Sequence, residues 1–241
     1  MRIFVPCAVC VKKRSNKDPI KMIPGELDGG VIFVTCAEGH KTAVLYRTRR
    51  YKLLLESGAR ALIDGYANES IASFSTAVER AYEFYLRVIF RSKGIPKETF
   101  EAAWKDVTVQ SERQYGAFHM LFLMENKTVL KLNPDIPRMR NRIIHQGQMA
   151  KEEDAITFGR LVFERVIEIE NALKANQSFA DDEEKSEIEM QKVSIPIGIE
   201  SMVLEVIPAL VDNNNQSRVP ENFSEFLSTV VHKMKEEDRI S

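Results

Sequence analysis

Apolar residues recur at steps of three and four along residues 70–90, which is the repeat of an α-helix with one buried face. Glu79 and Glu83 lie outside or beside this apolar stripe, so they are expected at the surface. The turn sequence Gly94-Ile95-Pro96 ends the helix. The stripe itself consists of Ile71, Phe74, Val78, Ala81, Tyr85 and Val88.

Other segments of the chain have the same helical spacing. Helices are predicted over residues 52–63, 97–105, 111–125 and 152–173. Pro134 and Pro137 begin a further helix that carries Arg140 to His145, because proline suits the first turn of a helix. The middle of the chain is therefore expected to be an α-helical bundle of at least four helices.

Residues 1–50 have a different pattern, in which short β-branched or aromatic runs alternate with turn residues. Strands are predicted over residues 2–5, 31–35 and 42–46, with turns supplied by the glycines between them. This part is too small and too charged to form a core of its own, so it needs a metal or another crosslink. The expected fold is mainly α, with a small N-terminal β module.

The pattern divides the chain into four parts. They are the β module at residues 1–50, a helical domain at residues 51–176, an acidic linker or solvated loop at residues 177–192, and a C-terminal segment at residues 193–241. Asn222-Phe-Ser-Glu225 resembles a capping box and predicts a terminal helix within the last part. Pro196 and Gly198 interrupt the apolar run that precedes it, so no element is predicted there.

The overall charge of the chain does not point to nucleic acid. The net charge is −1 and the isoelectric point is near 6.5, whereas nucleic-acid-binding domains are often strongly basic. Any indication of nucleic-acid binding must therefore come from local basic clusters. One cluster comprises Arg47, Arg49, Arg50 and Lys52, and a second comprises Arg138, Arg140 and Arg142.

The cysteines and the hydropathy of the chain indicate a reducing compartment. All three cysteines lie within residues 1–36, and an odd number argues against a complete disulfide framework. Cys7 and Cys10 interrupt the only apolar start, so a signal peptide is not expected. Nor is any segment long enough without charge or proline to span a bilayer. We therefore expect a cytoplasmic protein that does not enter the membrane.

The spacing of cysteine and histidine predicts a metal site in the β module. Cys7-x2-Cys10 is followed by Cys36-x3-His40, and together they supply the four ligands of a tetrahedral zinc ion. Four protein ligands leave no open position, so one structural Zn²⁺ per chain is expected. This part resembles the zinc ribbons found at protein termini. Unrelated thiols and a redox CxxC pair are the alternatives.

A second set of residues has the chemistry of RNA cleavage. Arg140, Asn141 and His145 lie within one short helical stretch. Attack by a ribose 2′-hydroxyl on a phosphate needs a group that takes the proton and a group that holds the developing negative charge. On a straight helix Asn141 and His145 share a face, while Arg140 lies roughly 140° from His145. The long arginine side chain could reach round, or two copies of the helix could combine.

The sequence Arg140-Asn141-x3-His145 resembles the R-polar-x3-H motif of the HEPN superfamily (higher eukaryotes and prokaryotes nucleotide-binding domains). The predicted helices of residues 51–176 also resemble the helical domain of that superfamily, so the resemblance covers roughly half the chain. It implies a metal-independent endoribonuclease that cleaves RNA through 2′-hydroxyl attack and is active as a homodimer. Such proteins often act as toxins or in anti-phage defence.

The resemblance also implies a role for each motif residue. His145 would be the general base or acid, because imidazole titrates near neutral pH. Arg140 would stabilise the charged transition state with its forked donors. Asn141 would orient His145 or bind a phosphate oxygen. The residues expected to contact the RNA backbone are Arg138, Arg142, Arg49 and Arg50.

Other functions remain open at the level of the sequence. The helical domain could be a non-catalytic dimer that binds RNA, a nucleotide or a protein. The zinc module could instead be an adaptor that recruits another chain. A cognate inhibitor or regulatory partner is compatible with each function. In the structural alternative, Arg140 and Arg142 are solvated helix charges and His145 is a hydrogen-bonded core residue.

Overall fold

The computed structural model describes residues 3–14, 20–28, 30–131, 134–205 and 220–240. The chain forms two compact units. The β unit comprises the described residues within 1–48, 184–206 and 239–241, and the helical unit comprises those within 49–183 and 207–238. The protein is mostly helical and has a small N-terminal sheet, which confirms the predicted fold class.

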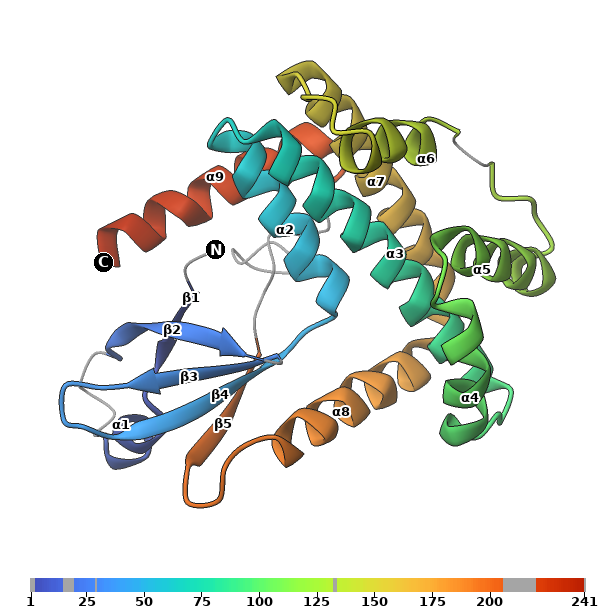
Figure 1. Ribbon diagram of the computed structural model, residues 1–241. Helices are drawn as coiled ribbons and strands as arrows, with labels where there is room; N and C mark the ends of the chain where they lie inside the picture. The colour runs from blue at the N-terminus through green and yellow to red at the C-terminus, as the bar shows by residue number, and fades with distance from the viewer. Residues whose placement is uncertain (1–2, 15–19, 29, 132–133, 206–219, 241) are drawn as a thin grey trace. The chain divides into compact units, whose positions relative to one another are not determined.

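The β unit is a five-stranded sheet with the strand order β1-β2-β3-β4-β5 (Figure 1). The elements are β1 (Ile3–Pro6), helix α1 (Ala8–Lys13), β2 (Met22–Asp28), β3 (Val31–Thr35), β4 (Lys41–Arg47) and β5 (Glu200–Glu205). Strands β1 to β4 pair antiparallel in sequence order, whereas β5 pairs parallel with β4 from Thr42↔Glu200 to Arg47↔Glu205. The prediction located β1, β3 and β4 but missed β2, where it expected turns, and it ended the module at residue 50, so it also missed β5.

The acidic segment after the bundle is a helix and not the linker or solvated loop that its composition predicts. Helix α8 spans Gln177–Val193. Glutamate is a good helix former, and Ile188 gives the helix a buried contact with Val31 and Leu45 of the sheet. The expectation was wrong because it weighed the charge of the segment and not its helix propensity.

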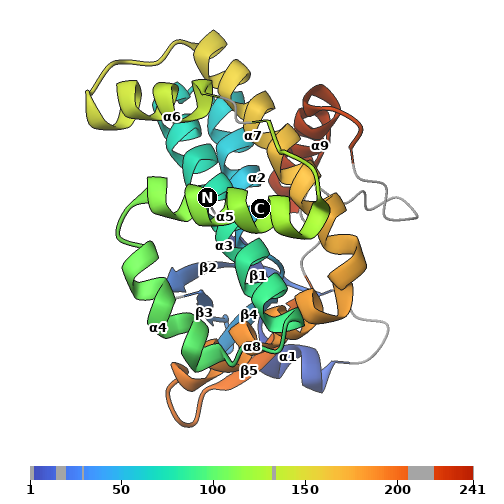
Figure 2. The same ribbon diagram turned by 90° about the vertical axis from the view of Figure 1, so that its right-hand side faces the viewer.

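The helical unit is built around one long central helix. Helix α3 (Ala67–Ser92) packs against α2 (Arg50–Ile63), α5 (Ser111–Asn126) and α7 (Glu152–Leu173). Figure 2 shows α5 lying across α3. All six residues of the predicted apolar stripe on α3 are buried, which confirms the helical periodicity. The remaining helices of the unit are α4 (Lys97–Val107), α6 (Asp135–Arg140) and α9 (Phe223–Ile240).

Helix α9 begins where the capping sequence predicts. The Glu225 backbone N–H donates to the Asn222 side-chain oxygen at 3.0 Å, and the Glu225 carboxylate accepts from the Glu221 N–H at 2.6 Å. The apolar face of α9 places Phe226 and Val230 in the core of the helical unit. None of the described helices is long and apolar enough to cross a membrane.

Two glycines make room for the central phenylalanine of α3. A Cβ atom added at Gly58 of α2 would lie 2.6 Å from Phe74 Cδ1, and one added at Gly159 of α7 would lie 2.6 Å from Phe74 Cε2. The same added Cβ at Gly159 would also lie 2.6 Å from Phe223 Cζ. Because such distances are far below van der Waals contact, these glycines allow close approach of α2, α3 and α7.

We expect Gly159→Ala to lower the free energy of unfolding by about 2 kcal/mol, because an overpacked core must shift to accept a methyl group. The matched control is Gly116→Ala in α5, where an added Cβ meets no atom within 4 Å among the described residues. The control should raise the free energy of unfolding by about 0.5–1 kcal/mol through helix propensity. Urea denaturation measures both changes, and equal shifts in the two variants would contradict this account of the core.

Candidate functional site

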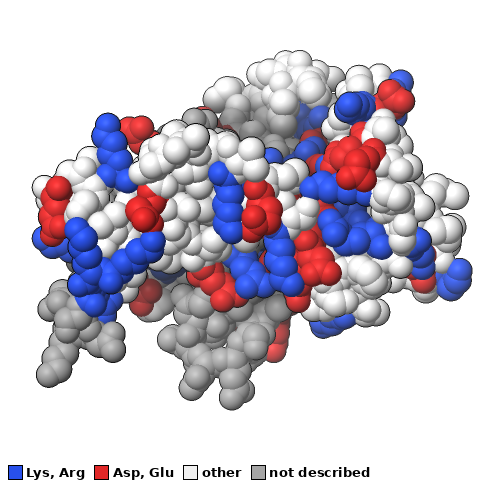
Figure 3. Space-filling model, turned by 90° about the horizontal axis from the view of Figure 1, so that it is seen from below, with Lys and Arg blue, Asp and Glu red and all other residues white. Residues whose placement is uncertain are grey.

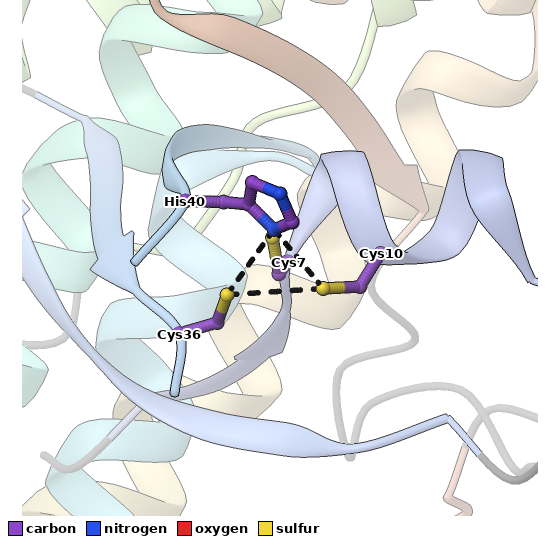
Figure 4. Close-up of side chains that lie close together, drawn as sticks. All are labelled: Cys7, Cys10, Cys36 and His40. Atoms are coloured by element: carbon purple, nitrogen blue, oxygen red, sulfur yellow. Dashed lines mark hydrogen bonds between the residues drawn. The ribbon is translucent and has the colours of Figure 1, made fainter. Parts of the chain in front are cut away.

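The cysteine and histidine pairs come from two turns of the β unit (Figure 4). Cys7 is the N-cap residue of α1, and Cys10 lies within that helix. Cys36 and His40 flank the turn between β3 and β4. In this turn the Gly39 N–H donates to the Cys36 carbonyl at 2.9 Å, and Gly39 has a positive φ of 78°. The glycine therefore lets the turn tighten, as the sequence predicts.

The four side chains converge on one point. The Cys10 and Cys36 sulfurs are 3.8 Å apart, and His40 Nδ1 lies 3.5 Å from the Cys10 sulfur and 3.4 Å from the Cys36 sulfur. With Cys7 included, all four ligand atoms lie within 4.8 Å of one another. The cluster can hold a single metal ion, and it is His40 Nδ1 that faces the sulfurs.

The three thiols of the cluster differ in how readily they ionise when no cation is bound. Burial opposes ionisation of Cys7, but hydrogen bonds from Cys10 and Thr42 lower its pKa. The pKa of Cys36 is also lowered against burial, by backbone hydrogen bonds from Glu38 and His40. Burial and the neighbouring thiols raise the pKa of Cys10 to about 12. A divalent cation would stabilise all three thiolates, so binding would release protons.

The predicted RNA-cleaving residues lie where α6 continues into a π-helical turn at Asn141–His145. The Gln146 N–H donates to the Asn141 carbonyl at 3.1 Å, a bond between residues five apart. A π-helical turn contains more residues than an α-helical one. It therefore brings Arg140 and His145 closer to one face than the straight helix assumed from the sequence, and that assumption was wrong. Turns of this type often occur at functional sites.

Arg140 is oriented by side chains from two other helices. Its Nη1 donates to Ser111 Oγ of α5 at 2.7 Å, and its Nη2 lies 3.2 Å from Glu79 Oε1 of α3. The Arg140 side chain is 20% exposed to solvent. An arginine has five N–H donors, so donors remain for a bound phosphate. The periodicity of α3 indicated only that Glu79 is a surface charge, and no local signal connects it to Arg140.

The other motif residues lie in different environments. His145 is exposed, so it is not the core residue of the structural alternative. Among the described residues, the Arg140 guanidinium bonds to Ser111 and Glu79 and makes no hydrogen bond to His145. Asn141 is half-buried. Arg142 donates to Asp154 Oδ1 at 3.0 Å. The Arg138 side chain is 77% exposed, and its Nη1 atom comes no closer than 4.0 Å to Asp135 Oδ1.

Arg49 is not available to contact an RNA backbone, which corrects the sequence-based expectation. It is 5% exposed, and its guanidinium pairs with Glu170 at 2.8 Å and lies 5.1 Å from the centre of the Phe84 ring. The neighbouring Arg50 is exposed. Arg49 stands next to Arg50 in a basic run of the sequence. This context contains no indication that the Arg49 side chain is buried in the helical unit.

Basic and acidic side chains are interspersed over much of the face drawn in Figure 3. Ion pairs within the helical unit show the same balance, for example Arg87 with Glu83 at 2.7 Å. Among the described residues, charges of both signs therefore offset one another on this face, which has no large positive field.

No protein-family model, curated protein or solved structure matches the chain.

The Arg49–Glu170 pair should make the free energy of unfolding depend on pH in the acid range. Burial opposes ionisation of Glu170, but Lys52 and Arg49 lower its pKa below the ordinary value. A carboxyl with a lowered folded-state pKa contributes stability that is present above its ordinary pKa, about 4.3. That contribution is lost as the pH falls through the folded-state pKa.

We expect Glu170→Gln to cost about 2 kcal/mol of unfolding free energy at pH 7, because it leaves buried cations with less compensation. The variant should also lose less stability than the wild type below about pH 4. Glu164→Gln is the matched control on α7, since the Glu164 side chain is 56% exposed. Urea titrations at several pH values measure both effects. The same acid dependence in Glu170→Gln and the wild type would contradict the assignment.

Proposed function

We propose that the protein is a metal-independent endoribonuclease of the HEPN type, in which Arg140, Asn141 and His145 cleave RNA through attack of a 2′-hydroxyl. The observation that supports the proposal is a π-helical turn that carries the exposed His145 and follows directly after Arg140, which Glu79 and Ser111 anchor. An anchored guanidinium and an accessible imidazole are the two groups that this reaction needs.

Arg140, Asn141 and His145 each have a role in the proposed reaction. His145 takes the proton from the 2′-hydroxyl or gives a proton to the leaving 5′-oxygen. Arg140 donates its remaining N–H groups to the phosphate oxygens as negative charge develops. Asn141 orients the imidazole or binds a phosphate oxygen. The products are a 2′,3′-cyclic phosphate and a 5′-hydroxyl end.

A second copy of the chain would complete this site. His145 and Arg140 are not hydrogen-bonded to each other within one copy, in the part of the chain that the structure describes. Two copies that meet at the motif would place the His145 of one beside the Arg140 of the other. A toxin or anti-phage effector, controlled by a cognate inhibitor, is the biological role that we propose for such an enzyme.

The activity should depend on His145 and on the ribose 2′-hydroxyl. We expect His145→Ala to lower the rate of cleavage of single-stranded RNA by at least about 100-fold, the usual contribution of a general acid or base. His232→Ala is the matched control, because His232 is also exposed but lies on α9. Denaturing gels of end-labelled RNA, in a brief assay with a magnesium chelator, measure the rate.

Two outcomes would reject the mechanism. One is cutting that persists when the ribose at the cut nucleotide lacks its 2′-hydroxyl. The other is loss of cutting in chelator that magnesium alone restores. RNA binding without cutting, equal in wild type and His145→Ala, would instead support the non-catalytic binding dimer.

We also propose that the metal of the β unit is a structural zinc ion. Zinc–sulfur bonds of about 2.3 Å and a zinc–nitrogen bond of about 2.0 Å in a tetrahedron place sulfurs roughly 3.8 Å apart, and sulfur and nitrogen roughly 3.5 Å apart. The cluster has separations of 3.8, 3.5 and 3.4 Å. Three thiolates and an imidazole complete the coordination, so the ion would hold α1 to the β3–β4 turn and would not act on substrate.

Elemental analysis should find about one zinc per chain, and Cys36→Ala and His40→Ala should each lose it. Glu38→Gln is the matched control, because this carboxylate lies 3.6 Å from His40 Nδ1 but is 70% exposed. The control should keep its zinc. Removing zinc with a strong chelator should lower the melting temperature measured by circular dichroism. A metal-free protein with unchanged melting would refute the structural role.

A further inference from the structure

Arg140 lines a small pocket together with residues of α3, α5 and α6. Its volume is about 70 Å³. Sites that enclose a whole small molecule have volumes of ~300–1,000 Å³, so this pocket has room for only part of a ligand. Arg140 forms one edge of the pocket, which places the pocket next to the phosphate that this residue would bind.

The lining of the pocket combines aromatic, apolar and acidic groups. The rings of Tyr82 and Tyr115 are 5.5 Å apart, and Val78 and Ile136 add apolar surface. Glu79 contributes a carboxylate, and its side chain is 22% exposed. Bases of single-stranded RNA are commonly recognised by stacking on aromatic side chains and by hydrogen bonds to their edges. Tyr82 is buried and stacks on Phe118 at 4.3 Å, so the half-buried Tyr115 is the lining ring that could stack on a base. Glu79 is the group that could bond to the edge of the base.

A buried hydroxyl in the wall of the pocket points to a ligand independently. Ser75 is 3% exposed and lines the pocket, and its Oγ has no hydrogen-bond partner among the described residues. An unsatisfied buried hydroxyl is costly and calls for an explanation. A serine hydroxyl has three staggered positions about its side-chain torsion, so it can adjust to a ligand in the pocket.

We propose that this pocket is a nucleobase subsite that selects cytosine next to the phosphate held by Arg140, an inference that rests on the proposed function. Cytosine has an amino group at N4, which donates to a carboxylate such as Glu79. Its O2 and N3 atoms accept, so they suit the hydroxyl of Ser75. The small volume favours a single ring over a fused purine.

The same lining rejects uracil. Uracil has a carbonyl oxygen at position 4 in place of the amino group, and this oxygen would face the Glu79 carboxylate with no proton between them. A hydrogen bond to a charged group is worth enough to change a rate or an affinity by about tenfold or more. The pocket should therefore distinguish cytosine from uracil, because the contact between position 4 of the base and the Glu79 carboxylate is attractive for cytosine and repulsive for uracil.

The subsite can be tested by cutting and by binding. We expect wild-type protein to cut next to cytosine about tenfold more often than next to uracil, measured by sequencing the ends of RNA products. The His145→Ala variant should bind oligocytidylate about tenfold more tightly than oligouridylate, measured by fluorescence anisotropy. Glu79→Gln, introduced alone for the cutting assay and together with His145→Ala for the binding assay, should bring both ratios close to one, because an amide can donate to the uracil oxygen.

Glu83→Gln is the matched control for the preference for cytosine over uracil. Glu83 lies one turn further along α3 and pairs with Arg80 and Arg87, outside the pocket. This variant should keep the preference for cytosine. Ser75→Ala supplies a second test, since removal of an unsatisfied hydroxyl should not lower the free energy of unfolding. It should nevertheless weaken binding of oligocytidylate several-fold, a combination that a purely structural role would not produce.

The outcomes separate the subsite from the nuclease activity. Cutting without a preference for cytosine would overturn the subsite and leave the activity intact. Selective binding of oligocytidylate without cutting would support the subsite and reject the activity. Equal binding of the two oligonucleotides, or a preference that Glu79→Gln leaves unchanged, would overturn the subsite.

Discussion

The packing of Phe74 between two glycines is the contact on which the helical unit depends. It brings α2 and α7 against α3 so closely that no side chain fits at Gly58 or Gly159. The next residue, Ser75, and the following turn with Glu79 line the pocket beside Arg140. The same helix therefore supplies core on one face and candidate site on the adjacent face. A shift of α3 would move Glu79 and with it the anchor of Arg140.

Features with a short-range cause could be predicted from the sequence. The apolar stripe of α3 repeats with the period of one helix, and its residues are buried. The capping sequence at Asn222 and Glu225 depends on residues three apart. The cysteine and histidine pairs each lie within one turn, so their spacing showed that each turn could supply two ligands. In each case the residues that interact are neighbours in the chain.

Features that depend on distant partners could not be predicted in this way. Strand β5 exists because it pairs with β4, and its own sequence follows a proline and a glycine that suggest a break. The burial of Arg49 depends on Glu170 of α7. The contact between Arg140 and Glu79 joins α6 to α3. A π-helical turn also has no signal in the periodicity, because it is one wider turn in an otherwise helical stretch.

The pairing of charges determines how an RNA strand could bind at Arg140. Phosphate groups bind strongly to proteins with many free cations, and such binding is steeply dependent on salt. Here Arg142 is paired with Asp154 and Arg140 with Glu79, so a phosphate would meet carboxylates beside each guanidinium. Little affinity would then come from charge alone. Binding would have to come from the donors that Arg140 keeps and from contacts to the sugar and base, which depend on the nucleotide and not only on its charge.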